Sequence, residues 1–560
     1  MNIGPMLNLY PDSLGGKLSA AVRLLENRLN GAFSSVYLLP SVFHTDLDRG
    51  FSVISYDLNR KLATADDLAR LKALGLDLKL DFILNHLSVL SPQFQDLLEK
   101  GSESPYRDFF IDWNRFWAGH GTMTEHGWIQ PDPDAIRGMM FRKAGLPLLM
   151  VRFPDGSEVP YWNTFYQQVR YAPVDAPLLM KRLHLQYAEA EELADTINPL
   201  LASGTAPEEL PVDGGIRDDL LRLLAERRSY LGQMDLNLAS PLVWAYYAET
   251  LKRLADYGAA IVRLDAFAYA PKGVGRRNFL NEPETWQVLQ RVAELARPGN
   301  VTLLPEIHAT YAEATYRTLK EQGYMTYDFF LPGLMIDAIE HHDPAHLAAW
   351  AKELNDQKIR TVNMLGCHDG IPMLDLKGLL PDERIQSLID LIVQRGGLIK
   401  NLHGAKNVYY QVNATYYSAL GADDRKMLLA RAIQLFMPGK PQIWYLDLFA
   451  GQNDLEAVQR GGDGAHKEIN RTNLDAATIE KRLELPLVRR QLALLKLRNR
   501  CSAFAEDADF SVRAEGSLLH LTWRHEDRSA TLVADLTDHS FRVEADLPEG
   551  PVVWSEDFDA

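Results

Sequence analysis

Cysteine is scarce in this chain, and its scarcity excludes several classes of protein. Only two cysteines occur among 560 residues, and they stand far apart at Cys367 and Cys501. A disulfide-stapled secreted scaffold needs more cysteines than this, and structural zinc sites need closely spaced pairs. We therefore expect a reducing compartment and no disulfide framework.

A membrane segment and an excess of positive charge are also missing. No uninterrupted apolar run reaches the ~20 residues that cross a bilayer, and the N-terminus MNIGPMLNLYPDS lacks the pattern of a signal peptide. The net charge is −16, so neither nucleic acid nor an anionic membrane would attract the protein. These absences favour a cytoplasmic enzyme. A small phosphate stays possible as a substrate, because the cations of a pocket act locally.

Short apolar runs alternate with longer amphipathic segments over most of the length. This pattern is typical of repeated βα units around a parallel sheet. We predict eight strands, the number that a closed (β/α)8 TIM barrel needs, at residues 4–10, 36–40, 78–84, 260–265, 301–306, 324–330, 361–366 and 441–446. The helices predicted between them include residues 241–257, 283–296, 344–354 and 382–394.

Two long connections interrupt the predicted barrel, and a small domain follows it. We place the barrel at residues 1–86, 240–370 and 423–503, an inserted domain B at 87–239, a second insertion at 371–422 and a C-terminal antiparallel β domain at 504–560. Domain B contains an extra helical segment at about 166–231. That segment is either a solvated helical pair or a lid or dimer contact, which leaves a homodimer open.

The stretch AAIVRLDAFAY, at residues 259–269, resembles a buried strand that ends in a polar site. Side chains alternate along a strand, so Arg263 and Asp265 share a face. A guanidinium can hold the carboxylate ionised and oriented, as a nucleophile or a metal ligand requires. From this stretch alone, a structural ion pair explains the two residues equally well.

Four of the predicted strands, including this one, end in polar residues. These are Asn85 and His86 after the third strand, Arg263 and Asp265 at the fourth, Glu306 and His308 at the fifth, and His368 and Asp369 after the seventh. In a barrel the carboxyl ends of all strands meet at one rim, where active sites lie. Each residue alone has a structural explanation, but four such ends together favour an active site.

Three acids around one pocket suit the cleavage of a glycosidic bond. That reaction needs an ionised carboxylate, a protonated carboxylic acid and donors that bind sugar hydroxyls. Metal binding is the competing use of such a cluster. The HxxxH pair of His342 and His346 falls away from these strand ends, and Arg263 would repel a cation, so we expect no metal.

Four motifs resemble the characteristic regions of the α-amylase superfamily, glycoside hydrolase family 13. They are DFILNH (81–86), VRLDAFAY (262–269), LPEIH (304–308) and GCHDG (366–370). Further stretches resemble the branch of sucrose phosphorylase and its relatives that act on glucosylglycerol and glucosylglycerate, namely GFSVISYD, KGLLPDE, YYQVNATYYSALGADD, FMPGKPQIWYLDLFAGQNDLE and EINR. The resemblance covers nearly the whole chain except the insertion before Gln233.

The resemblance implies a role for each matching residue. Asp265 would be the nucleophile, Glu306 the general acid and base, and Asp369 the stabiliser of the distorted sugar. The implied glucose contacts are His86, Arg263, His368 and Arg471, with Phe51 and Phe165 as aromatic walls and Gln233 at the return to the barrel. The family pairs its arginine, here Arg471, with an acid, and at the position where we expect that acid the chain has Ser52.

The resemblance also implies how phosphate and the acceptor are bound. Tyr269 and His308 match phosphate contacts of this branch, and its mobile arginine corresponds to Arg142 or Lys143, which otherwise form a solvated loop pair. Gln411 lies in the acceptor loop, where Val408 replaces an aspartate of sucrose phosphorylase. This change favours an acceptor such as glycerol or glycerate over fructose, with Lys406 or Arg142 as the cation for a charged acceptor.

The sequence therefore predicts a retaining phosphorylase of a small α-glucoside. It would use inorganic phosphate as co-substrate, need no cofactor and form α-glucose 1-phosphate by double displacement. A phosphate-independent hydrolase or transglucosidase is the main alternative. A non-catalytic amylase-like scaffold is a remote one, since such chains typically lose catalytic acids and carry a membrane anchor.

Overall fold

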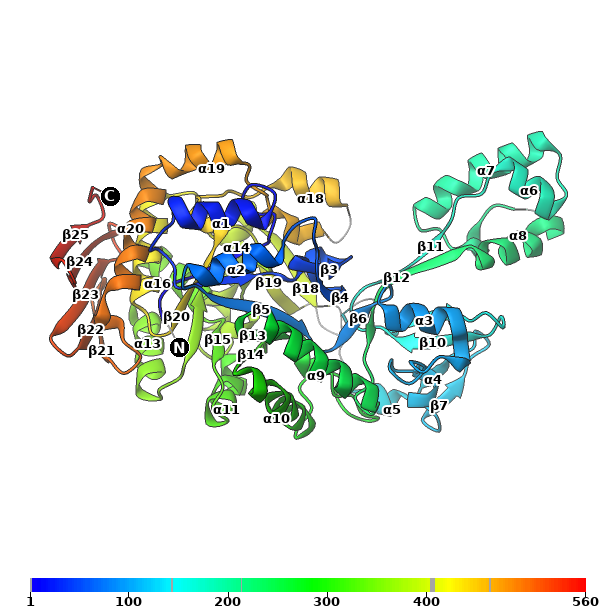
Figure 1. Cartoon of the computed structure of the whole chain (residues 1–560), viewed down its shortest axis with the longest axis horizontal. Helices are drawn as coiled ribbons and strands as arrows, with labels where there is room; N and C mark the ends of the chain where they lie inside the picture. Colours follow the sequence, from blue (N-terminus) through cyan, green and yellow to red (C-terminus); the bar gives the residue numbers. More distant parts are fainter. Residues whose placement is uncertain are drawn as a thin grey trace.

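Eight parallel strands form a nearly closed barrel, as predicted (Figure 1). The computed structural model describes residues 3–139, 141–142, 145–212, 214–402, 408–462 and 465–559, without the side chains of residues 400–402 and 408–410. The strands are β1 (Met6–Leu9), β2 (Ser35–Leu38), β5 (Asp77–Ile83), β13 (Ala259–Asp265), β14 (Thr302–Pro305), β15 (Thr326–Asp328), β16 (Thr361–Met364) and β20 (Lys440–Trp444). They follow the order β14-β13-β5-β2-β1-β20-β16-β15, and β14 contacts β15 where the ring closes.

Helices of the expected period surround this barrel. Among them are α9 (Pro241–Asp256), α10 (Glu284–Ala296) and α13 (Ala345–Asp356), which match three predicted helices closely. Proline at the first turn of α9 suits a helix start because its missing N–H would be unpaired there. Near the end of the barrel the chain forms two helices, α19 (Ala476–Leu483) and α20 (Pro486–Arg500), because Pro486 begins a new helix.

Domain B leaves the barrel after β5 and returns through a long strand. Its β6 (His86–Ser88) pairs with β12 (Arg228–Asp235), and β12 pairs in turn with β11 (Gln167–Tyr171), all antiparallel. The helices and strands between β6 and β11 are α3 (Pro92–Lys100), α4 (Trp113–Phe116), β7 (Gly121–Met123), β8 (Ile129–Pro131), α5 (Pro133–Ile136), β9 (Leu148–Arg152) and β10 (Glu158–Trp162). This arrangement brings the end of β12 back beside the end of β5, next to the rim.

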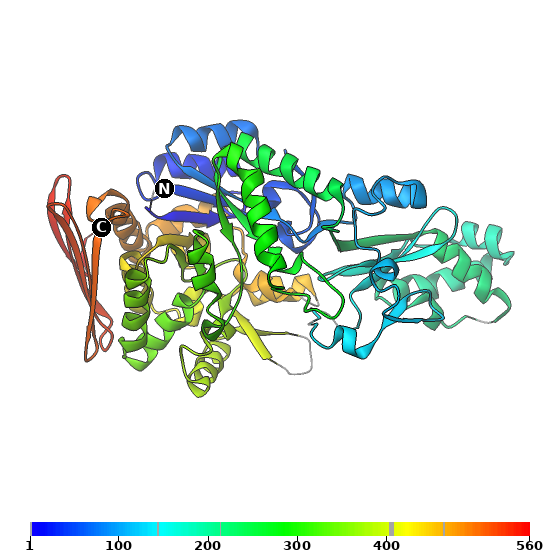
Figure 2. The same ribbon diagram turned by 90° about the horizontal axis from the view of Figure 1, so that it is seen from below.

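Three helices, α6 (Ala176–Leu183), α7 (Tyr187–Ala202) and α8 (Gly214–Glu226), stand on the β11–β12 ribbon, apart from the barrel (Figure 1, Figure 2). We expected a helical pair. The structure has three helices because His184 adopts a left-handed conformation, with φ of 57°, and so separates α6 from α7, while β12 begins shortly after α8. The helices bury their apolar side chains against one another, for example Leu179, Ile197 and Leu224. In both views they lie far from the rim, so they do not cover it in this arrangement.

The second insertion and the C-terminal domain complete the chain. Residues after β16 form α14 (Asp382–Gln394) and an antiparallel sheet of β17 (Ile371–Pro372), β19 (Val408–Asn413) and β18 (Leu398–Leu402). Five antiparallel strands, β21 (Asp509–Glu515) to β25 (Gly550–Ser555), form the C-terminal sheet at the opposite end of the molecule from the three helices (Figure 2). The period-two pattern of the sequence therefore predicted this sheet correctly.

The three-helix unit gives a first prediction. Replacing residues 172–227 by an Asn-Gly turn should leave the rest folded, because Tyr171 and Arg228 are already paired across the ribbon. We expect the thermal unfolding midpoint of the remainder to move by less than about 5 °C in calorimetry. A fall of more than about 10 °C, or insoluble protein, would mean that the helices support the barrel.

Candidate active site

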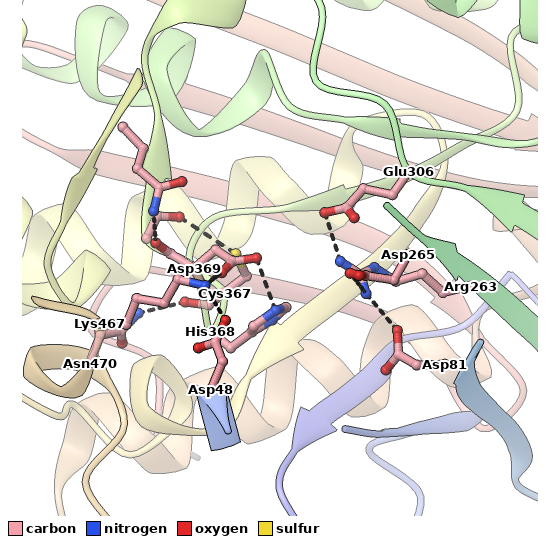
Figure 3. A network of polar contacts seen from close by, with 12 residues as sticks. Asp48, Asp81, Arg263, Asp265, Glu306, Cys367, His368, Asp369, Lys467 and Asn470 are labelled. Carbon is pink, nitrogen blue, oxygen red and sulfur yellow. Dashed lines mark hydrogen bonds and ion pairs between the residues drawn. The ribbon is translucent and has the colours of Figure 1, made fainter. Parts of the chain in front are cut away.

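A buried arginine binds three carboxylates at the carboxyl end of the barrel (Figure 3). Arg263 is 2% exposed, and its Nη1 lies 2.6 Å from Asp81 Oδ1 and 2.8 Å from Asp265 Oδ1, while its Nη2 lies 2.7 Å from Glu306 Oε1. The register of the sheet explains this contact, because Arg263 on β13 is opposite Asp81 on β5 and Leu304 on β14. Two of the predicted catalytic acids, Asp265 and Glu306, thus share one guanidinium.

The protonation of these two acids is set by burial and by their partners. Burial raises the pKa of Asp265 well above its usual value, although Arg263 opposes this. Burial also raises the pKa of Glu306, but Arg263 and His308 more than offset it and lower that pKa. These shifts favour a proton on Asp265 over a proton on Glu306.

The third acid, Asp369, lies on the other side of the site. Its Oδ2 is 2.9 Å from His368 Nε2 and its Oδ1 is 2.6 Å from Lys467 Nζ. Burial raises its pKa, but these two neighbours more than offset the effect and hold the pKa well below the usual value. The Gln411 side chain donates to the Asp369 carbonyl at 2.5 Å, which fixes the backbone there. Asp369 is thus held ionised and in one orientation.

Arg471 does have a carboxylate partner, and our expectation that the chain lacks one was wrong. Asp48 Oδ1 lies 3.2 Å from Arg471 Nη1, and Asp48 Oδ2 lies 3.1 Å from Lys467 Nζ. Ser52 is fully buried, and its hydroxyl has no hydrogen-bond partner among the described residues. The signal in the sequence was the acid three residues before Phe51, in DRGF, rather than the residue after it.

Phe51, His86 and Gln233 form one connected wall. The Phe51 ring stacks on His368 with centroids 4.8 Å apart. Its carbonyl accepts hydrogen bonds at 2.9 Å from both His86 Nε2 and Gln233 Nε2. Because a carbonyl only accepts, His86 carries its proton on Nε2. The expected glucose contacts His86 and His368 therefore lie on either side of Phe51.

Aromatic residues and Arg142 form the side next to domain B. Phe165 contacts both His86 and Tyr269, with centroid distances of 5.1 and 5.2 Å. Arg142 Nε donates to Tyr269 Oη at 2.7 Å. The structure therefore brings Arg142 to the predicted phosphate contact Tyr269. Lys143 and Lys406 lie outside the described residues.

A pocket is lined by Arg263, Glu306, His308, His368, Asp369 and Gln411, among others, whereas Asp265, Tyr269 and Arg142 are not among its lining residues. By contrast, His342 and His346 contact Leu536 and Asp337, outside the residues that line this pocket. Among the residues that the structure describes, no group of three or more His, Cys, Asp or Glu could hold a metal ion. Within the same residues, no helix is long and apolar enough to cross a membrane.

A second buried ion pair, which the sequence did not reveal, links the barrel to domain B. Asp235, at the end of β12, lies 2.6 Å from Lys272 Nζ and accepts hydrogen bonds from Asn85 Nδ2 at 2.9 Å and from Thr164 Oγ1 at 2.7 Å. Lys272 also donates to the carbonyl of Tyr269 at 2.8 Å. This network therefore fixes the loop that carries Tyr269 against the returning strand.

Removing Asp235 should destabilise the protein strongly. In Asp235→Ala the Lys272 ammonium, with a side chain 2% exposed, loses its charged partner, which costs about 3–5 kcal/mol. We expect this loss in urea unfolding, and we expect Asp235→Ala with Lys272→Met to recover more than half of it. A single variant as stable as the parent, or a double variant no better than the single, would contradict this account.

Comparisons with known proteins agree with this geometry. Sucrose 6(F)-phosphate phosphorylase of Ilumatobacter coccineus is 49% identical over 549 residues, which cover 96% of this chain and 95% of that protein. Glucosylglycerol phosphorylase of Marinobacter adhaerens is 29% identical over 95% of each chain. A scan of protein-family models found no match.

Solved structures give the same result. The crystal structure of sucrose 6F-phosphate phosphorylase from Thermoanaerobacter thermosaccharolyticum superposes with a TM-score of 0.80 at 31% identity and covers 99% of this chain and 98% of that one. The α-amylase of H. orenii, at 15% identity and a TM-score of 0.61, shares the fold over 97% of this chain and 91% of its own.

Fold and site define a (β/α)8 barrel enzyme with its acids at the carboxyl ends of the strands. Within that class, the chain belongs to the sucrose phosphorylase-like branch of glycoside hydrolase family 13. It is therefore a glycoside phosphorylase, an enzyme of the glycosyltransferase type, and the scaffold alternative is set aside.

Proposed function

We propose that the protein is a retaining phosphorylase of sucrose 6F-phosphate, forming α-glucose 1-phosphate and fructose 6-phosphate. The observation that carries this proposal is the shared guanidinium of Arg263, which holds Asp265 and Glu306 side by side. Retaining enzymes keep their two carboxyl groups about 5–5.5 Å apart, whereas inverting enzymes need about 6.5–9.5 Å to admit a water. Two carboxylates on one guanidinium fit the shorter spacing.

In the first step, a carboxylate oxygen of Asp265 attacks the anomeric carbon of the glucosyl group. The bond from that carbon to the leaving oxygen breaks, and Glu306 donates its proton to that oxygen. The ionised Asp369 stabilises the positive charge that develops on the sugar ring. In the second step, a phosphate oxygen attacks the same carbon, the bond to Asp265 breaks, and Glu306 takes the proton of the hydrogen phosphate.

The partners of Glu306 favour the protonation state opposite to the one that the first step needs. Arg263 favours the ionised form of Glu306, whereas the acid must be protonated. We infer that Glu306 leaves Arg263 as the glucoside binds and turns toward the leaving oxygen. Arg263 then keeps only Asp81 and Asp265 as partners and favours the charged form of Asp265, so one movement reverses both protonation states.

One feature supports a phosphorylated glucoside over the sucrose, glucosylglycerol or glucosylglycerate that the sequence first suggested, and two more support an anionic one. A relative that is 49% identical is a sucrose 6(F)-phosphate phosphorylase. Arg142 brings positive charge to Tyr269, the predicted phosphate contact. Val408 carries no charge, so that position of the acceptor loop does not repel an anion.

The choice of glucoside can be measured directly. With inorganic phosphate present, kcat/KM for sucrose 6F-phosphate should exceed that for sucrose at least about tenfold, because a charge-assisted hydrogen bond contributes about 1.5–3 kcal/mol. Release of α-glucose 1-phosphate would be followed for these two substrates, glucosylglycerol and glucosylglycerate, with Asp265→Asn as the inactive control.

Two outcomes would contradict parts of the proposal. Equal kcat/KM for sucrose and sucrose 6F-phosphate would contradict the proposal that sucrose 6F-phosphate is the substrate. Free glucose formed at the same rate with and without phosphate would make the enzyme a hydrolase.

A further inference from the structure

A buried carboxylate lies behind His308, on the side of the ring away from Glu306. Asp375 belongs to the short helix η8 (Leu374–Leu376), and its side chain is 2% exposed. Its Oδ1 lies 3.3 Å from His308 Nδ1. We propose that Asp375 is a positioning residue that keeps His308 cationic, so that phosphate rather than water resolves the glucosyl enzyme. This inference rests on the proposed phosphorylase function.

The position of the His308 ring supports this role. The ring stacks on Phe329 with centroids 3.9 Å apart and planes at 21°, while Asp375 contacts Nδ1, so two contacts fix its orientation. Nε2 points to the other side, 3.6 Å from Glu306 Oε1. That distance is an ion-pair contact rather than a hydrogen bond. An anion that enters beside Glu306 therefore meets the Nε2–H group.

The charge of the ring follows from its neighbours. Burial lowers the pKa of His308, but Asp375 and Glu306 more than offset this and raise the pKa to about 9. The ring is thus an imidazolium at neutral pH. Without the charge of Asp375, burial would favour the neutral ring, as it does for His86 and His368.

The positive charge of His308 should affect the attack of phosphate and the attack of water differently. Phosphate is an anion, and it must approach Glu306, which is ionised after it has given up its proton. The His308 imidazolium lies between Asp375 and Glu306. It offsets the repulsion between phosphate and Glu306 and adds a charge-assisted hydrogen bond to phosphate. Water is neutral and needs no such cation, so Asp375 should matter for phosphorolysis and little for hydrolysis.

The variant Asp375→Asn tests this inference because it removes the charge and keeps the shape. Initial rates would be measured with one glucoside, first against phosphate concentration and then without phosphate as glucose release. We expect KM for phosphate to rise about tenfold or more, since a charge-assisted hydrogen bond is lost, and hydrolysis to change less than about twofold. Asp343→Asn, which alters a side chain that is 41% exposed, serves as the matched control.

A double variant separates positioning from a general structural effect. If Asp375 acts through His308, Asp375→Asn combined with His308→Gln should be no worse than His308→Gln alone. In the unaltered enzyme, KM for phosphate should stay low from about pH 7 and rise only near pH 9, the pKa of His308. This pH profile remains a test even if the variant does not fold. Among the residues that the structure describes, the charged groups in contact with the ring include Asp375 and Glu306, the latter bound to Arg263.

Three results would overturn the inference. These are an unchanged KM for phosphate in Asp375→Asn, a parallel fall of phosphorolysis and hydrolysis, and a rise of KM centred near the ordinary histidine pKa of about 6.5. An unaltered enzyme that ignores phosphate would instead refute the proposed function, so the two failures are distinguishable.

Discussion

The site depends on one buried charge, the guanidinium of Arg263. A buried cation is costly unless it is paired, and Arg263 is paired with Asp81, Asp265 and Glu306. These partners come from three consecutive strands, β5, β13 and β14, whose parallel register sets them around the arginine. The strand register that forms the barrel therefore also sets the positions of these three acids. A shift of register on β13 would turn Arg263 away from Asp81 and Glu306, its partners on the two neighbouring strands.

A second set of charges lies across the pocket and depends on loops rather than strands. Asp369 binds Lys467, Lys467 binds Asp48, and Asp48 binds Arg471, whose Nε donates to the carbonyl of His368 at 3.0 Å. The last of these contacts is to the backbone of His368, the residue before Asp369, so the series ends next to the residue where it began. Glucose would thus lie between a rigid arginine cluster on the strands and a closed ring of loop charges. The position of Asp369 therefore depends on contacts between loops.

The sequence was sufficient to predict the elements whose residues follow a local period. Alternation and apolar runs predicted the eight barrel strands and the C-terminal sheet, and the polar strand ends predicted that Asp265, Glu306 and Asp369 would meet. Contacts between distant loops leave no periodic signal, so the partners of Arg471 and His308 were missed. Asp375 is 67 residues from His308, and no pattern joins them. The break between α6 and α7 depends on one backbone conformation, at His184, which helix propensity does not reveal.

The most direct test of this account is to trap the glucosyl enzyme. A 5-fluoro-α-glucosyl fluoride should transfer its sugar to the nucleophile and turn over slowly, so that peptide mass spectrometry can locate the adduct. The account predicts a single adduct on Asp265 and its loss when phosphate is added, with the α anomer of the glucosyl phosphate as the product. An adduct on another carboxylate, or a β-configured product, would contradict the double displacement on which the account depends.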